Sequence, residues 1–179
     1  MLVSVELVRL CFLGRIKFNF STNERHQVST SKITVVFTKR RMNPISWFIR
    51  WAVPRSRFAL ALSSHCMIVD GDYIIEAHMR HGVRRVLANE AMKGLTIVRS
   101  INYSVANAED GLAWGREQCG AGYDWAGAFG TAIEVDREWQ NPSEWFCYEL
   151  AASVIKNAGR DAFAEYGCIT ESTLLSIKP

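Results

Sequence analysis

Three side chains that lie far apart in the chain have the types needed for thiol catalysis: His65, Glu76 and Cys147. A cysteine becomes a nucleophile when its thiol loses a proton, and a nearby imidazole can accept that proton. A carboxylate beside the imidazole fixes its tautomer and stabilises its charged form. Such a set would attack an amide or ester carbonyl, provided that the fold brings the three side chains together.

A predicted β-hairpin brings the first two of them together. Two apolar runs flank Asp70-Gly71, a dipeptide typical of a two-residue hairpin turn. With this turn, His65 lies directly opposite Glu76, and their Cβ atoms are about 4.5–5.5 Å apart. A register slip of one residue would put the two side chains on opposite faces. The alternative interpretation is an ordinary His–Glu pair on the protein surface.

A helix predicted over residues 144–158 carries Cys147 near its start and ends at Gly159. The N-terminal signals are Asn141 as cap, Pro142 at the first helical position and Glu144 in a capping box, with Ser143 as an alternative cap. The positive end of the helix dipole favours a thiolate at Cys147. Backbone N–H groups at the same helix start could hold a developing oxyanion.

The remaining patterns predict an α+β fold, a small antiparallel sheet or barrel packed against helices. Further strands are expected at 33–37 and 95–101, and further helices at 106–119, before Gly120, and at 123–133. At 179 residues the chain is long enough for one domain with its own core. We place that domain at residues 42–179.

Residues 1–41 are interpreted as an N-terminal extension of uncertain order, with strand-like runs at 3–7 and 15–20. Residues 1–60 contain 11 Lys and Arg but only two Glu, whereas residues 61–179 contain 10 basic and 16 acidic residues. A short aromatic helix is expected at 45–53. Its Trp47, Phe48 and Trp51 are interpreted as core residues, with a membrane-surface or virion contact as the alternative.

Cysteine usage indicates a reduced compartment. The five cysteines are an odd number without a C-x-x-C pair, which argues against a disulfide framework and a structural zinc site. Apart from Cys147, we expect them to be buried and inert: Cys11, Cys66, Cys119 and Cys168. No apolar run has the length of a membrane span or the form of a secretory signal. The expected location is therefore a soluble one, cytoplasmic or virion-associated.

Other ligands are disfavoured by the sequence. His78 and His81 are three residues apart, but we expect them in a loop with Arg80, Arg84 and Arg85, which is unfavourable for a cation. The basic residues form no recognisable nucleic-acid-binding motif. We therefore expect no metal, no cofactor and no nucleic-acid partner, and a peptide or acyl group as the substrate.

Two blocks of the chain resemble the permuted NlpC-like (YiiX-like) group of papain-fold cysteine hydrolases. Residues 64–69 (SHCMIV), residues 73–77 (YIIEA) and Gly82-Val83 resemble the family's histidine block. Tyr123-Asp124-Trp125 and residues 145–152 (WFCYELAA) resemble its cysteine block. The family's order, with the histidine strand first and the cysteine helix last, is also the order of this chain. The resemblance spans about residues 43–177.

This resemblance implies a catalytic triad of Cys147, His65 and Glu76. It further implies cleavage or transfer at an amide or ester bond, with cell-wall peptides or lipid acyl groups as substrates, and it raises the possibility of a phage origin. Tyr123 falls where the family places an aromatic residue near the pocket, although a structural tyrosine fits equally well. Tyr148 replaces the usual serine after the nucleophile. We expect this bulky side chain to line and reshape the substrate cleft, so Tyr123 and Tyr148 are the residues expected to bind substrate.

Two other functions fit the sequence. A non-catalytic virion or structural binding module on the same fold would also carry these blocks, because a fold does not establish an activity. A lipid-directed acyl hydrolase or transferase would use the tryptophan-containing segment at 45–53 to contact a membrane.

Overall fold

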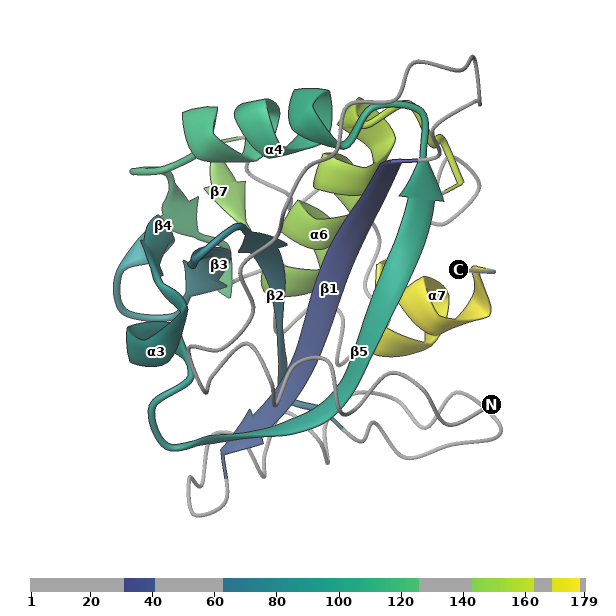
Figure 1. Cartoon of the computed structure of the whole chain (residues 1–179). Coiled ribbons are helices and arrows are strands. Elements are labelled where there is room, and N and C mark those ends of the chain that lie inside the picture. Colours follow the sequence, from purple (N-terminus) through teal and green to yellow (C-terminus); the bar gives the residue numbers. More distant parts are fainter. Residues whose placement is uncertain (1–30, 41–62, 126–142, 163–168, 178–179) are drawn as a thin grey trace.

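The computed structural model describes residues 31–40, 63–125, 143–162 and 169–177 (Figure 1). Within these ranges, five antiparallel strands form one sheet in the order β4-β3-β2-β1-β5. The strands are β1 (Ser31–Arg40), β2 (His65–Asp70), β3 (Tyr73–His78), β4 (Gly82–Leu87) and β5 (Leu95–Val105). Two short parallel strands, β6 (Gly122–Tyr123) and β7 (Glu144–Trp145), form a second sheet. The helices are α3 (Ala88–Ala91), α4 (Ala108–Glu117), α6 (Cys147–Asn157) and α7 (Glu171–Ser176). The expected α+β class with an antiparallel sheet is confirmed.

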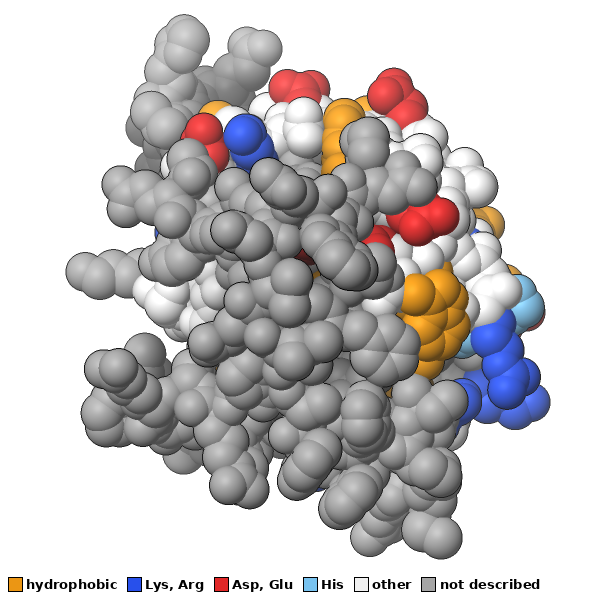
Figure 2. All heavy atoms as spheres, turned by 180° about the vertical axis from the view of Figure 1, so that it is seen from behind, with side chains coloured by type: hydrophobic (Ala, Val, Ile, Leu, Met, Phe, Trp, Pro, Cys, Tyr) orange, Lys and Arg blue, Asp and Glu red, His pale blue; other side chains and the backbone are white. Residues whose placement is uncertain are grey.

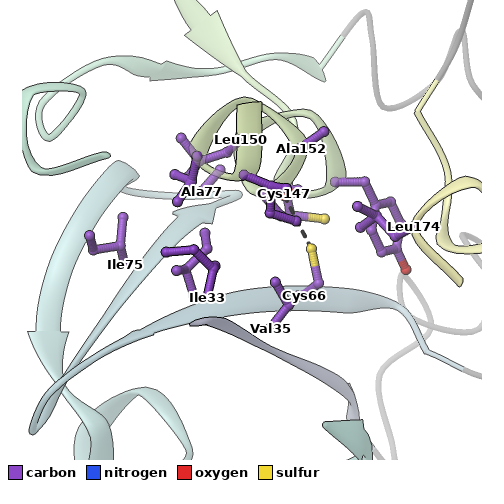
Figure 3. Packing of buried hydrophobic residues seen from close by; sticks show 14 of the residues in the cluster. Ile33, Val35, Cys66, Ile75, Ala77, Cys147, Leu150, Ala152 and Leu174 are labelled. Carbon is purple, nitrogen blue, oxygen red and sulfur yellow. Dashed lines mark hydrogen bonds between the residues drawn. The ribbon is translucent and has the colours of Figure 1, made fainter. Parts of the chain in front are cut away.

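The main core lies between the sheet and α6 (Figures 1 and 3). Alternate residues of the strands point to this side, because successive side chains of a strand face opposite ways. They include Ile33 and Val35 of β1 and Ile75 of β3, which pack with Leu150 and Val154 of α6. A smaller cluster on the other face contains Met67, Ile74 and Ala91. The sheet is thus apolar on both faces near β2 and β3.

Strand β1 is an interior strand of this sheet, between β2 and β5. The strand predicted at 33–37 is confirmed and extends over Ser31–Arg40, where it pairs with β2 on one side and with β5 on the other. It precedes the domain boundary that we placed at residue 42, so the sheet contains residues from both sides of that boundary. The strands expected at 3–7 and 15–20 and the helix expected at 45–53 lie outside the described residues.

The hairpin between β2 and β3 forms, but the predicted register was wrong by two residues. The turn is Gly71-Asp72, and Asp70 pairs with Tyr73 instead of lying in the turn. Gly71 has a φ of 61°, a conformation that glycine adopts without steric cost. Asp70 stays in the strand because its buried carboxylate accepts hydrogen bonds from Arg85 and Arg116. A shift of two residues leaves every side chain on its predicted face.

Helix α6 begins three residues later than predicted. Residues 144–145 form β7, which pairs with β6, and the helix starts at Cys147 with Phe146 as an N-cap that makes no side-chain capping bond. The capping box predicted for Glu144 therefore does not form at α6, and Asn141 and Pro142 lie outside the described residues. The helix ends at Asn157, close to the predicted end, and Gly159 follows with a φ of 87°.

Two other elements differ from the prediction. The segment containing Arg84 and Arg85 is strand β4 rather than a loop, because both guanidinium groups pair with carboxylates of the neighbouring β2–β3 hairpin. Tyr123 belongs to β6, and the first helical residue after it is Trp125, so the helix expected at 123–133 begins two residues later than predicted. Residues 126–133 lie outside the described residues. The predicted strand at 95–101 is confirmed as β5, and the predicted helix at 106–119 as α4, which Asn107 caps.

Helices α4 and α6 approach each other closely at one glycine. A Cβ atom on Gly111 would lie 2.4 Å from the carbonyl oxygen of Val154, so only glycine fits at this contact. The contact fixes α4 against α6 and thereby helps to hold the start of α6 against the sheet. No helix in the described part of the chain is both long and apolar enough to cross a membrane.

Candidate functional site

Strands β2 and β3 bring His65 and Glu76 together, although not as direct opposites. Continuing the observed register places His65 across from residue 78, so that Glu76 is its diagonal neighbour on the same face. The histidine Nε2 lies 2.7 Å from Oε2 of Glu76. The predicted contact is therefore present, and its geometry differs from the prediction because the turn is displaced.

Glu76 has a second partner that the sequence did not identify. Arg84 lies directly opposite it on β4 and donates hydrogen bonds from Nε and Nη2 to Oε1 at 2.9 and 2.6 Å. The carboxylate is only 2% exposed and uses both oxygens, one for the imidazole and one for the guanidinium. One signal in the sequence could have identified Arg84: Gly82 is followed by a segment with both apolar and charged residues, which could form a strand that pairs with β3.

Cys147 occupies the first position of α6, and this helix packs against β2. Its thiol lies close enough to His65 and Cys66 for each of them to shift its pKa. The structure thus brings together the three residues predicted from the sequence, in the order carboxylate, imidazole, thiol.

These contacts change the charge states of all three groups. Burial alone raises the pKa of Cys147, but hydrogen bonds from Cys66 and His65 and the charge of His65 lower it to about 5. For His65, burial lowers the pKa, whereas the Cys147 and Glu76 partners raise it to about 10. Burial raises the pKa of Glu76, but His65 and Arg84 bring it down to about 2. At neutral pH these opposite shifts favour a thiolate beside an imidazolium.

The sulfur atom is closed to solvent in this structure. Cys147 is 1% exposed, whereas the His65 side chain is 19% exposed. Our hypothesis required a nucleophile that a substrate can reach, and this geometry does not provide an open path to it. A carbonyl group can reach the sulfur only after some of the surrounding atoms move.

The two tyrosines predicted to bind substrate lie around the start of α6. Tyr148 is buried; its hydroxyl is 3.0 Å from Oγ of Ser63, and its ring packs against Phe37 and Phe146. Tyr123 is also buried and meets Phe146 edge to face. Contact of either tyrosine with a substrate stays a prediction.

The aromatic side chains near the start of α6 extend to the protein surface through Trp125. Tyr123 packs edge to face against Trp125, which is 44% exposed. Figure 2, which shows the side opposite to the view of Figure 1, has an apolar patch next to basic (Lys or Arg) and histidine side chains. The aromatic groups around Cys147 are therefore continuous with an exposed side chain.

The other cysteines and histidines have different environments. Cys66 is buried as predicted, but Cys119 is exposed because it lies just beyond the end of α4; Cys11 and Cys168 lie outside the described residues. The rings of His78 and His81 stack with centroids 4.8 Å apart. Burial and the nearby charge of Arg84 lower the pKa of His78 to about 4, although Glu76 opposes this. In the described ranges, no three His, Cys, Asp or Glu side chains gather as metal ligands.

Comparisons of the chain with protein-family models, with curated proteins and with solved structures give no match.

Proposed function

We propose that this chain is a cysteine hydrolase of the amidase or peptidase type, with Cys147 as nucleophile, His65 as general base and acid, and Glu76 as the group that orients His65. The observation that carries this proposal is a series of neighbours: Glu76 contacts His65, and His65 lies beside a cysteine at the first position of a helix. Both the imidazolium and the helix dipole favour the thiolate form at this position.

The reaction would begin with attack of the Cys147 thiolate on the carbonyl carbon of an amide or ester. The carbonyl oxygen gains negative charge, and backbone N–H groups at the start of α6 are suited to stabilise it because they have no partners within the helix. His65 then gives its proton to the leaving amine or alcohol, which leaves an acyl group on the sulfur. A water molecule, deprotonated by His65, hydrolyses this thioester and restores the thiolate.

The same arrangement supports a permuted papain-like fold as the finer assignment. The histidine strand precedes the cysteine helix in the chain, and the helix start packs against an antiparallel sheet. A peptide of the bacterial cell wall is the substrate class that the sequence resemblance implies, in line with a phage-encoded enzyme. The aromatic surroundings of Cys147 fit a substrate with an apolar portion next to the scissile bond.

The proposal is tested with p-nitrophenyl acetate, an activated ester that needs no knowledge of the natural substrate. We expect release of p-nitrophenol and an acetyl group on Cys147, detected by mass spectrometry of the intact protein and its peptides. Cys147→Ala and His65→Ala should abolish both signals, whereas Cys119→Ala, which removes an exposed thiol, should leave both unchanged. Acetylation that persists in Cys147→Ala, or a folded wild-type protein that is never acetylated at this residue, would refute the proposal.

A non-catalytic binding module is the second candidate, and the burial of Cys147 favours it. In such a protein the Glu76, His65 and Cys147 contacts would stabilise the fold only. Alkylation by iodoacetamide separates the two functions. A catalytic Cys147 reacts rapidly in the native protein at pH 6, where Cys119 is protonated because an ordinary thiol ionises only at a higher pH and partial burial raises the pKa of Cys119 further. A structural Cys147 reacts only after denaturation.

A further inference from the structure

A second thiol lies beside Cys147, and the proposed reaction does not use it. Cys66 of β2 is fully buried, and its Sγ donates a hydrogen bond to the carbonyl oxygen of Cys147 at 3.1 Å. Figure 3 shows the Cys66 side chain pointing from β2 towards the start of α6, in the same apolar layer as the Cys147 side chain. The two thiols are also close enough to shift each other's pKa in opposite directions, upwards for Cys66 and downwards for Cys147. This is a pair of thiols in contact, brought together from segments 81 residues apart in the chain.

We propose that Cys66 and Cys147 form a peroxide-reactive pair, in which oxidation of Cys147 is captured by Cys66 as a reversible disulfide. The inference rests on the proposed function only in so far as both use the Cys147 thiolate. The reach of Cys66 to the backbone of Cys147 agrees with the short separation that a disulfide needs, about 3.5–4.5 Å between Cβ atoms.

The oxidation requires one peroxide molecule and takes place in two steps. The Cys147 thiolate attacks one oxygen of hydrogen peroxide and breaks the O–O bond; the leaving hydroxide takes the proton of the His65 imidazolium and departs as water. Cys147 is now a sulfenic acid. The Cys66 sulfur then attacks the sulfur of Cys147, and the expelled hydroxyl group leaves with the Cys66 proton as a second water. Peroxide is reduced, and the two thiols are oxidised to a disulfide.

The different surroundings of the two thiols fit this division of roles. Burial and the adjacent Cys147 thiolate raise the pKa of Cys66, so Cys66 stays protonated and does not compete for peroxide. Burial of the pair restricts access to small oxidants such as hydrogen peroxide. A sulfenic acid without a neighbouring thiol proceeds to sulfinic acid, which thiol reductants do not reverse. Disulfide formation with Cys66 would thus inactivate Cys147 reversibly and prevent its irreversible oxidation.

The test uses the full-length reduced protein treated with hydrogen peroxide, followed by blocking of free thiols and peptide mapping by mass spectrometry. We expect the intact protein to lose two hydrogens and a peptide pair linked through Cys66 and Cys147 to appear, with both thiols restored by dithiothreitol. In Cys66→Ser, Cys147 should instead gain oxygen atoms that dithiothreitol does not remove. Cys119→Ser should form the same link as the wild type.

Wild-type protein whose Cys147 accumulates sulfinic acid without a link to Cys66, or whose link joins Cys119 to another thiol, would overturn the inference. The wild-type result is decisive even if the Cys66→Ser protein does not fold. Failure of the proposed function is a separate outcome, because the p-nitrophenyl acetate assay would then show no acetylation of Cys147 while the disulfide still formed. An acetylated Cys147 that never links to Cys66 would contradict this inference alone.

Discussion

Replacing Glu76 with glutamine tests whether this carboxylate sets the charge of the catalytic imidazole. The substitution Glu76→Gln keeps the size of the side chain but removes the charge that His65 contacts at 2.7 Å. A hydrogen bond to a charged group contributes about 1.5–3 kcal/mol, which corresponds to about one to two pKa units. We therefore expect the pKa of His65 to fall from about 10 by that amount.

The assay is a titration of the His65 ring by NMR. The imidazolium should lose its proton at a lower pH in the Glu76→Gln protein than in the wild type, because the charge that stabilises it is gone. Glu109→Gln is the matched control, since this carboxylate is 67% exposed and pairs with Arg116 away from the site. An unchanged His65 titration in the Glu76→Gln protein, with its fold intact, would show that the reasoning is wrong.

The same Glu76→Gln variant and two further changes test the energetics of the fold. The pKa of Glu76 is lowered to about 2 in the folded protein, so its ionisation stabilises the fold above the unfolded pKa of about 4.5. The wild type should therefore be more stable than Glu76→Gln above that pH, and this advantage should decline as the pH falls towards 2. Urea unfolding at several pH values measures the difference. Thr38→Val removes a buried hydroxyl that has no hydrogen-bond partner, so the free energy of unfolding should stay the same or rise by about 1 kcal/mol. The control is Thr34→Val, which removes a hydrogen bond to Asn102 and should not raise the free energy of unfolding. Gly111→Ala should lower the melting temperature and cost about 1–3 kcal/mol, because its Cβ would meet the Val154 carbonyl; equal stability of this variant would contradict the close packing of α4 on α6.

The residues of the site could be predicted from the sequence more accurately than the way in which they contact one another. The strand at 33–37, the hairpin and the cysteine helix could be recognised because apolar periodicity and turn residues are local signals. The position of the turn could not be recognised in this way, because it depends on the hydrogen bonds by which Arg85 and Arg116 hold Asp70 in the strand. The start of α6 depends on β6, a segment more than 20 residues away in sequence, and the partner Arg84 depends on the pairing of β3 with β4. Such contacts between distant segments have no local signature.

The burial of Cys147 and its low pKa together impose a condition on the whole site. An isolated buried thiol stays protonated, because a buried charge without partners is unfavourable. The thiolate is therefore stable here only while His65 and Cys66 stabilise it, and His65 is charged only while Glu76 accepts from it. Arg84 in turn keeps Glu76 ionised. Loss of any member leaves a buried charge without its partner, so each substitution in this series should change the stability of the fold as well as the reactivity of the thiol.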